Sequence, residues 1–244
     1  MAAAPILCRN SKDSIRMNQV IVQSSGGITL VGGAPVSAAL FRISQQKAPV
    51  VVAADGGADR CLANGVRPDA VIGDMDSISD AARLAVGAER LHEIPEQDTT
   101  DFDKALRSLD CPFVIALGFI GARVDHGLAV LTTLVRQQRP CVLLGPHDVV
   151  FHAPARLRLA LRRGDRFSLY PLAKVTGSST GLDWPINGLD FAPDHRVGTS
   201  NRVSTGPVSL DLSGPGMLCI LPRARLDQAL EALTAAVRAD IRSR

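Results

Sequence analysis

Two carboxylates follow a short apolar run directly: residues 71–77 read Val-Ile-Gly-Asp-Met-Asp-Ser, which places Asp74 and Asp76 just after a predicted strand. The carboxyl ends of strands in an open α/β sheet border the crevice where ligands bind. Two like charges this close repel each other unless a cation lies between them. Mg²⁺ prefers carboxylate oxygens and is often shared with substrate phosphates. The pair therefore indicates a metal site, although Gly-Asp-x-Asp-Ser is also the chemistry of a solvated turn.

Three other segments place carboxylates beside glycines or threonines at predicted strand ends: residues 53–59 (AADGGAD), 97–106 (QDTTDFDKAL) and 121–128 (GARVDHGL). Each also has a purely structural explanation. The first is a good strand-to-helix turn, and acidic residues in the first turn of a helix are stabilised by its dipole. In the third, Arg123 and Asp125 could form a surface pair, or Arg123 could hold phosphate oxygens at a helix N-terminus.

Strand-like and helix-like segments alternate through the first half of the chain, which predicts a parallel sheet with helical crossovers. We expect Thr99 or Asp98 to cap the helix that starts near residue 101. The helix expected at 125–138 has Leu128, Leu131, Leu134 and Val135 on one face. The expected strands are 28–31, 49–54, 69–73, 91–94, 112–118, 141–144 and 148–151, and the other expected helices are 38–46, 80–86 and a short one ending near 62.

The second half changes pattern at residues 152–154. Short alternating segments at 157–161, 166–170, 208–212 and 217–221 are separated by glycine, proline and serine turns, which is typical of a small antiparallel sandwich. A helix over 226–241 closes the chain. The fold class is thus α/β, with a flexible extension at 1–27, a parallel-sheet catalytic domain at 28–152 and a smaller antiparallel β-sandwich domain with the C-terminal helix at 153–244.

Composition limits the function classes. Hydrophobic residues make up 46% and charged residues 21% of the chain, which is ordinary for a globular enzyme. A net charge of +3 with only 4% aromatic residues argues against single-stranded nucleic acid as a partner. There is no bilayer-spanning apolar run, no secretory signal pattern and no CxxC pair among the five cysteines, so we expect a cytoplasmic protein with reduced thiols.

Taken together, the four loops AADGGAD, GDMDS, QDTTDFDKAL and GARVDHGL closely resemble the thiamine pyrophosphokinase (thiamine diphosphokinase) family in order, spacing and strand-end placement. The later segments VTGSSTGLDWPI and GTSN resemble that family's thiamine-binding domain. The resemblance implies transfer of the pyrophosphoryl group of ATP to the hydroxyl of thiamine, giving thiamine diphosphate and AMP. It also implies a homodimer in which the partner subunit helps to hold thiamine.

The resemblance also implies roles for individual residues. Relatives often have glycine where this chain has Ala122, and an acidic residue where it has Arg202. Trp184, the sole tryptophan, is assigned to the thiamine ring on its chemistry, although it could be a core residue. The implied roles are Mg²⁺ binding for Asp74, Asp76 and Asp101, ATP or active-site contacts for Asp55, Gln97, Thr100, Arg123 and Asp125, and thiamine contacts for Ser200 and Asn201. Asp98, beside Gln97, is added to the ATP-binding residues on its chemistry.

These assignments agree with the chemistry of the residues, because phosphoryl transfer depends on positioning and on neutralising negative charge. We expect one or two Mg²⁺ ions, Arg123 beside the transferred group, and either Asp125 or Asp98 as the proton acceptor. The alternatives are a pyrophosphokinase for another hydroxymethyl heterocycle such as a dihydropterin, and a non-catalytic thiamine or nucleotide sensor.

Overall fold

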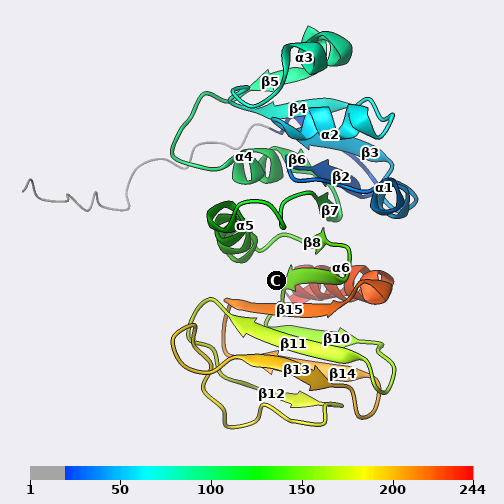
Figure 1. Ribbon diagram of the computed structural model, residues 1–244. Helices are drawn as coiled ribbons and strands as arrows, with labels where there is room; N and C mark the ends of the chain where they lie inside the picture. The colour runs from blue at the N-terminus through cyan, green and yellow to red at the C-terminus, as the bar shows by residue number, and fades with distance from the viewer. Residues whose placement is uncertain (1–19, 244) are drawn as a thin grey trace, which may run out of the picture.

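The computed structural model describes residues 20–243 (Figure 1). In that part of the chain it has a long mixed sheet, a three-stranded antiparallel sheet, a two-stranded parallel sheet and six α-helices. Residues 1–19 of the predicted N-terminal extension lie outside the described residues. The helices are α1 (Ala38–Gln45), α2 (Gly57–Ala63), α3 (Asp80–Val86), α4 (Asp101–Arg107), α5 (Val124–Gln137) and α6 (Leu226–Ser243), with 3-10 turns at Ala88–Arg90 and Arg223–Arg225.

The strands confirm the α/β class and the antiparallel second half. The first group is β1 (Val22–Gln23), β2 (Ile28–Val31), β3 (Val50–Ala54), β4 (Ala70–Gly73), β5 (Leu91–Glu93), β6 (Leu109–Asp110), β7 (Val114–Leu117) and β8 (Cys141–Leu144). The second group is β9 (Asp148–His152), β10 (Arg156–Leu159), β11 (Arg166–Pro171), β12 (Gly177–Thr180), β13 (Gly198–Arg202), β14 (Val208–Leu212) and β15 (Met217–Pro222). Within the predicted extension, β1 pairs in parallel with β6.

One ten-stranded sheet runs through both halves of the chain in the order β13-β11-β15-β9-β8-β7-β2-β3-β4-β5. The strands from β8 to β5 are parallel to one another, and β9, β15, β11 and β13 add to them in antiparallel fashion. The separate sheet β10-β14-β12 packs over the antiparallel end, where Leu157 and Leu210 meet Phe167 and Leu169 in one core. The division into domains at residue 152 stays a prediction, because β9 continues the sheet across it.

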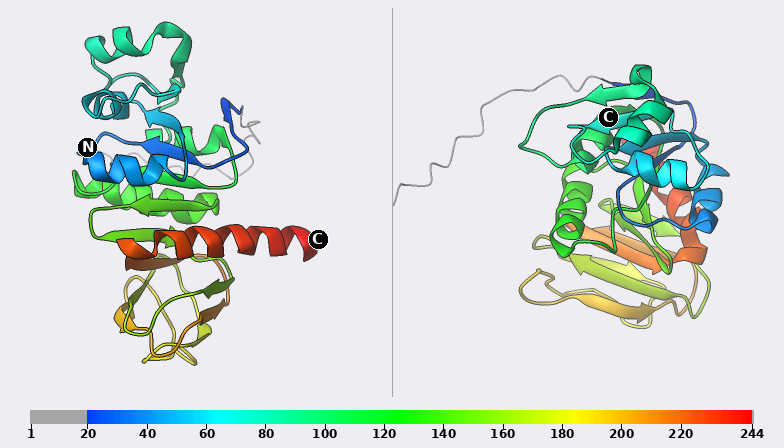
Figure 2. Two further views of the ribbon diagram at one scale, coloured as in Figure 1. Left: turned by 90° about the vertical axis from the view of Figure 1, so that its right-hand side faces the viewer. Right: turned by 45° about the horizontal axis from the view of Figure 1, so that its top comes forward.

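Helices cover both faces of the parallel part. The face with α1, α2, α3 and α6 shares its core with the three-stranded sheet, while α4 and α5 cover the other face. The last turns of α6 extend beyond the body of the molecule (Figure 2). No helix in the described range has the length and hydropathy needed to cross a bilayer.

One local prediction on this second face is wrong, and another holds for Leu131, Leu134 and Val135 but not for Leu128. The cap of α4 is Thr100, whose side chain accepts from the backbone N–H of Asp103, and not Thr99 or Asp98. Leu128 is 58% exposed, although Leu134 on the same helix is buried. The reason is that Gln137 in the last turn of α5 already contacts Asp103 in the first turn of α4. Since both helices run away from the carboxyl edge of the sheet, the earlier turns of α5 project past α4.

Candidate active site

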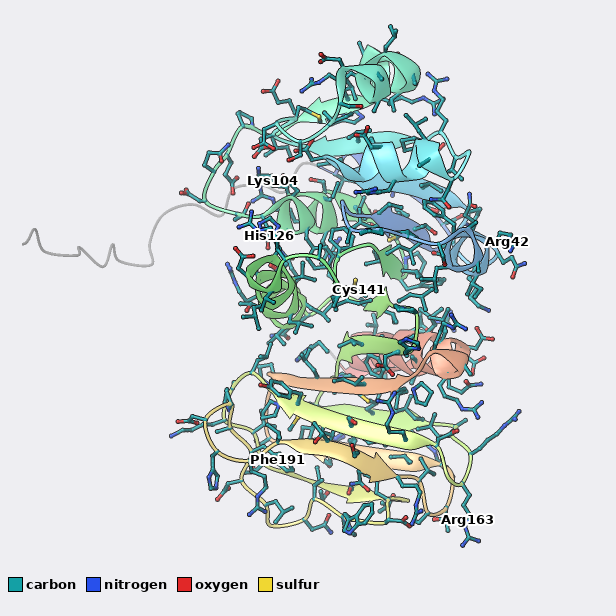
Figure 3. All side chains as sticks on the ribbon, viewed as in Figure 1. Arg42, Lys104, His126, Cys141, Arg163 and Phe191 are labelled. Atoms are coloured by element: carbon teal, nitrogen blue, oxygen red, sulfur yellow. The ribbon has the colours of Figure 1, made fainter. Side chains whose placement is uncertain are left out.

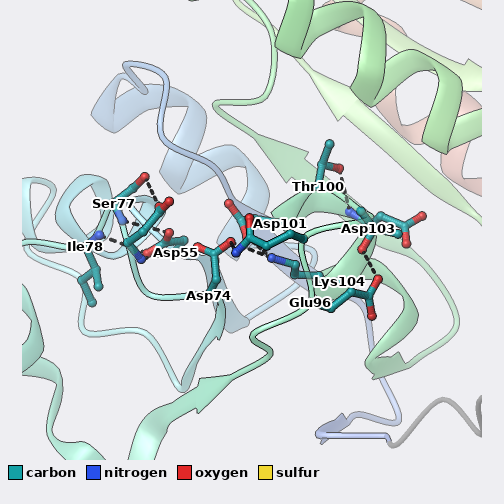
Figure 4. Close-up of polar contacts among 12 residues, drawn as sticks. Asp55, Asp74, Ser77, Ile78, Glu96, Thr100, Asp101, Asp103 and Lys104 are labelled. Atoms are coloured by element: carbon teal, nitrogen blue, oxygen red, sulfur yellow. Dashed lines mark hydrogen bonds and ion pairs between the residues drawn. The ribbon is translucent and has the colours of Figure 1, made fainter. Parts of the chain in front are cut away.

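Three aspartates from three different segments converge at the carboxyl edge of the sheet (Figure 4). Asp55 follows β3, Asp74 follows β4, and Asp101 is the first residue of α4. One carboxylate oxygen from each lies within 4.8 Å of the others. The parallel order β3-β4 places the first two loops side by side, and α4 packs against both strands. We call this group the acidic cluster.

Backbone geometry allows the three side chains to approach. A Cβ at Gly73 would lie 2.8 Å from the Cβ of Asp55 and 3.1 Å from Oδ1 of Asp101, so only glycine fits there. Asp55 and Met75 both have positive φ, at 42° and 66°. Such strained non-glycine residues concentrate at functional sites. The carboxylate of Asp55 accepts from the backbone N–H groups of Ser77 and Ile78, both at 3.0 Å, and so fixes the loop that carries Asp74.

Asp76 lies at the rim of this group. Its Oδ1 accepts from the hydroxyl of Ser77 at 2.7 Å, and its backbone N–H is 3.4 Å from Oδ1 of Asp74. The sequence predicted metal binding by Asp74, Asp76 and Asp101, whereas the three ligand atoms that the structure groups together belong to Asp55, Asp74 and Asp101. Asp76 still contributes charge, because it is one of the groups that raise the pKa of Asp55 and Asp101.

The electrostatics of the acidic cluster differ from residue to residue. Burial raises the pKa of Asp55 to about 6, helped by the neighbouring charges of Asp101 and Asp76 and opposed by the Ser77 backbone hydrogen bond. Burial also raises the pKa of Asp101. The hydrogen bond from Lys104 lowers the pKa of Asp74. A cation shared by these oxygens would favour all the ionised forms.

Lys104 supplies a positive charge inside the cluster, and the sequence analysis did not single it out. It is 1% exposed, and its Nζ lies 2.8 Å from Oδ2 of Asp74 and 3.3 Å from Oδ1 of Asp101. Burial lowers the pKa of Lys104, but the contacts with Asp74 and Asp101 outweigh it and the net shift is upward. The i,i+3 spacing of Asp101 and Lys104 on a helix was the available signal.

The strap that precedes α4 brings one predicted polar residue to the cluster. The side-chain amide of Gln97 donates to Oδ2 of Asp74 at 3.2 Å. Asp98 is exposed on the same strap, and Thr100 serves as the helix cap. The strap is held down by an ion pair between Glu96 and Arg107 at 2.7 Å.

Arg123 and Asp125 form an exposed pair at the start of α5. The guanidinium donates from Nε and Nη2 to the two carboxylate oxygens at 3.1 and 2.6 Å. The Arg123 hydrogen bond lowers the pKa of Asp125 to about 2. This is the surface pair that the sequence analysis gave as the alternative to phosphate binding by Arg123.

The predicted thiamine contacts gather around Trp184 in the second half of the chain. Trp184 is 61% exposed, so it is not a core residue. The side chain of Asn201 accepts from the backbone N–H of Trp184 and donates to its carbonyl, at 3.3 and 2.7 Å. Arg202 lies over the indole ring at 6.0 Å and pairs with Asp183. Ser200 has a φ of 63°. We call Trp184, Ser200, Asn201 and Arg202 the tryptophan platform.

The acidic cluster and the tryptophan platform are far apart within one chain. Asn201 lies on β13 and Asp74 follows β4, the first and ninth strands of the ten-stranded sheet. Eight strand spacings of about 4.8 Å make roughly 38 Å. In Figure 3, Lys104 marks the position of the acidic cluster. Phe191, which packs beside Gly198 of β13, marks the strand that carries Ser200 and Asn201. A single small ligand cannot touch both sites of the same chain.

Comparisons with a family model and with curated proteins all find similarity to thiamine pyrophosphokinases. The family model described as the thiamin pyrophosphokinase catalytic domain matches residues 41–144, which include the acidic cluster. The chain is 27% identical over 188 residues to thiamin pyrophosphokinase 1 of Caenorhabditis elegans, covering 68% of this chain and 76% of that protein. It is 27% identical over 200 residues to thiamine pyrophosphokinase 1 of Oryza sativa, covering 67% and 75%.

Solved structures show the same fold at low sequence identity. Thiamin pyrophosphokinase from Candida albicans superposes with a TM-score of 0.70 at 16% identity, covering 84% of this chain and 93% of that one. The protein from Geobacillus thermodenitrificans gives 0.65 at 20% identity, covering 80% and 96%. At these identities the likeness concerns the arrangement of the chain and not its chemistry.

Proposed function

Because the chain belongs to the thiamine pyrophosphokinase family, we propose that it transfers the pyrophosphoryl group of ATP to the hydroxyl of thiamine, giving thiamine diphosphate and AMP. The observation that carries the proposal is the convergence of Asp55, Asp74 and Asp101. Three carboxylates cannot bind a polyphosphate directly, so their position at a ligand crevice calls for a divalent cation. The named relatives support thiamine over a dihydropterin and an enzyme over a sensor.

The donor set of the acidic cluster fits Mg²⁺, since it offers carboxylate oxygens at close range and places no sulfur or imidazole among them. We assign Asp74 and Asp101 as ligands, with Asp55 and Asp76 as the further carboxylates of the site. When bound, the metal would neutralise phosphate charge. Gln97 and Lys104 would hold Asp74 in place, and Lys104 would add a fixed positive charge beside the phosphates.

The remaining groups would serve the transfer itself. The thiamine hydroxyl oxygen forms a bond to the β-phosphorus while the bond between that phosphorus and the α–β bridging oxygen breaks, so that AMP leaves with the bridging oxygen. Arg123 would stabilise the charge that develops. The hydroxyl proton needs an acceptor, and the candidates are Asp125 and Asp98, which lies on the exposed strap beside Gln97.

We further propose a homodimer in which the tryptophan platform of one subunit faces the acidic cluster of the other. The separation of roughly 38 Å within one chain supports this, because eight strand spacings lie between the two groups. A cytoplasmic location is also proposed, on the basis of the reduced and buried thiols Cys61, Cys141 and Cys219.

The test is incubation of the protein with thiamine, ATP and Mg²⁺, with AMP and thiamine diphosphate both quantified. We expect the two products in equal amounts and none after chelation of the metal. A parallel assay with hydroxymethyl-dihydropterin should give no AMP above background. Preference for the pterin would overturn the substrate, and calorimetric binding of thiamine and ATP without any AMP would show a sensor instead.

A further inference from the structure

A cavity of about 650 Å³ lies beside the second half of α6, whose last turns extend past the body of the molecule (Figure 2). Leu233 and Val237 of the helix form one wall, and the turn before β8 and the end of β9 contribute to the others. Because β8 starts at Cys141, the cavity lies at the amino edge of the parallel strands, whereas the acidic cluster lies at the carboxyl edge. Four strand spacings, or about 19 Å, also separate β8 from β4. We call this space the α6 cavity.

His152 presents an unused hydrogen-bond donor to the α6 cavity. This last residue of β9 is 8% exposed, and its Nε2 accepts the backbone N–H of Gly216 at 3.2 Å. Burial lowers the pKa of His152 to about 4, and a neutral imidazole that accepts at Nε2 carries its proton on Nδ1. Within residues 20–243, Nδ1 has no hydrogen-bond partner and is not sealed from solvent. This N–H is therefore open to the cavity that His152 lines.

Two arginines add positive charge. Arg139 is partly buried, and its Nη1 donates to the carbonyl of Leu106 at 3.0 Å and to that of Leu109. These contacts fix the guanidinium, while Nε and Nη2 make no hydrogen bond within the described residues. Arg156, at the outer lip, has a side chain that is 89% exposed and lies 4.0 Å from Asp211. None of the described residues that line the cavity is acidic, so its wall is positively charged.

We propose that the α6 cavity binds a small organic anion whose carboxylate or phosphate group is held by His152 and Arg139. The apolar part of the ligand would lie against Pro154, Leu233 and Val237. A cavity of this size suits a small organic molecule. An anion is favoured because fixed donors that include a guanidinium form the stronger, charge-assisted hydrogen bonds with it. The proposal does not depend on the proposed function, because the cavity and the acidic cluster share no residue.

The first experiment uses three probes on wild-type protein with ¹³C-labelled Leu, Val and Ala methyl groups. Phenyl phosphate and benzoate carry an anionic group on an aromatic ring, and benzyl alcohol is their neutral match. We expect saturable shifts of the Leu233 and Val237 methyl signals, with a dissociation constant below about 10 mM for at least one anion. Benzyl alcohol should bind at least about tenfold more weakly. The two anions together show whether the site prefers a carboxylate or a phosphate.

Four results of this experiment would overturn the proposal. If neither anion shifts the two methyl signals, the cavity is no anion site. If benzyl alcohol binds as well as the anions, the cavity is only an apolar groove. Shifts that follow protein concentration without any probe would show that a second copy of the chain fills the cavity. Displacement of phenyl phosphate by AMP would place the bound probe at the acidic cluster.

The second experiment changes the wall of the cavity. Ala236 lines the cavity, whereas its neighbour Ala235 is exposed and lies outside it. Ala236→Phe and Arg139→Gln should each weaken the better anion at least about tenfold. The matched controls Ala235→Phe and Arg136→Gln, the latter at an exposed arginine of α5, should change its affinity less than about threefold. Melting temperatures check that all four fold, and wild-type affinity in Ala236→Phe would place the anion elsewhere.

The Nδ1 proton of His152 gives a direct readout of the donor. Its signal, identified by its loss in His152→Gln, should move downfield when the anion binds. A signal that does not move would overturn the role of His152 as donor. Formation of thiamine diphosphate is measured separately, and Ala236→Phe should leave it at the wild-type rate. A protein that binds the anion and forms no thiamine diphosphate would keep the cavity assignment and lose the proposed function.

Discussion

The acidic cluster and the tryptophan platform are built on opposite electrostatic principles. In the cluster, three carboxylates lie within 4.8 Å of one another, and only Lys104 offsets their charge from within. In the platform, the Asn201 amide is satisfied by the backbone of Trp184, and Arg202 is paired with Asp183. The cluster therefore keeps an excess of negative charge, whereas the polar side chains of the platform are paired and its ring is exposed.

We expect this difference to separate the residues of the reaction from those that bind thiamine. Burial raises the pKa of Asp55 and of Asp101, and the neighbouring carboxylates raise both further, so keeping these groups ionised is costly. Proteins retain such arrangements where the charge is used. Changes in the acidic cluster should thus affect turnover, and changes in the tryptophan platform should affect binding of thiamine.

The largest expected effect is on turnover. Asp74→Asn removes a charge from the cluster but keeps the size of the side chain, so we expect turnover to fall by about 10³-fold while the fold is kept. Product formation at saturating Mg²⁺ and a melting curve measure the two. Asp190→Asn, an exposed aspartate in the second half of the chain, is the control. Near-normal AMP release by Asp74→Asn would refute the metal assignment.

Lys104→Met tests whether the positive charge of Lys104 and a bound metal ion neutralise the same carboxylates. Breaking a buried ion pair costs at most about 3–5 kcal/mol, and we expect the low end because Asp101 is partly exposed. That corresponds to a fall of roughly 6–10 °C in the melting temperature of the metal-free protein. Mg²⁺ should restore much of the lost melting temperature, while turnover stays low. Lys104→Arg keeps the charge, so a fall as large in that variant would point to packing and not to charge.

Trp184→Ala tests the platform. We expect the KM for thiamine to rise about tenfold with kcat nearly unchanged, because the exposed ring contributes binding that the transition state shares. Leu84→Ala, at a side chain that is 87% exposed, should leave both constants alone. A loss of kcat without a change in KM would place Trp184 in the chemistry and would remove the contrast between the two sites.

The smallest expected effects concern pH and have opposite signs. Asp55 is a carboxyl group whose pKa is raised by burial to about 6, so its contribution to stability is present below about pH 4 and is lost as the pH rises to 6. His152 is buried and accepts a hydrogen bond from the backbone N–H of Gly216, and burial lowers its pKa to about 4. Its contribution is present above its usual pKa and is lost as the pH falls to 4.

Melting temperatures between pH 4 and 7 without metal measure both contributions. The difference between wild type and Asp55→Asn should shrink by a few degrees as the pH rises, and the difference between wild type and His152→Gln should grow by about as much. Slopes of the same sign in the two variants would contradict this assignment.

Much of the first half of the chain could be predicted from local pattern. The continuous apolar residues of β2 and β3 predicted two buried strands, and Ser79 predicted the start of α3. The strands β12 and β13 were missed because Gly-Ser-Ser-Thr and Gly-Thr-Ser-Asn-Arg have no apolar alternation. The pairing of β9 with β15 is a contact between distant segments, so no local pattern could show that one sheet runs through both halves.

The segments that form the acidic cluster could be predicted, but not its detailed geometry. Residues of three of the four loops meet there, with Gln97 bonded to Asp74 and Asp74 close to Asp55 and Asp101. The functional roles of these residues stay predictions. The sequence could not show that Asp55 points into the cluster while Asp76 lies at its rim, since that depends on the positive φ of Asp55 and Met75. Lys104 was missed because a lysine on an amphipathic helix ordinarily faces solvent, and only its burial between two aspartates shows otherwise.

The eight strand spacings between Asn201 and Asp74 have a consequence for mixtures of two inactive variants. If each catalytic centre borrows its thiamine contacts from the neighbouring subunit, an Asp74→Asn chain and a Trp184→Ala chain are defective in different halves of the shared centre. Unfolding and refolding the two together would create mixed dimers in which one centre has both halves intact. Such a mixture would recover about a quarter of wild-type activity at low thiamine, more than either parent alone.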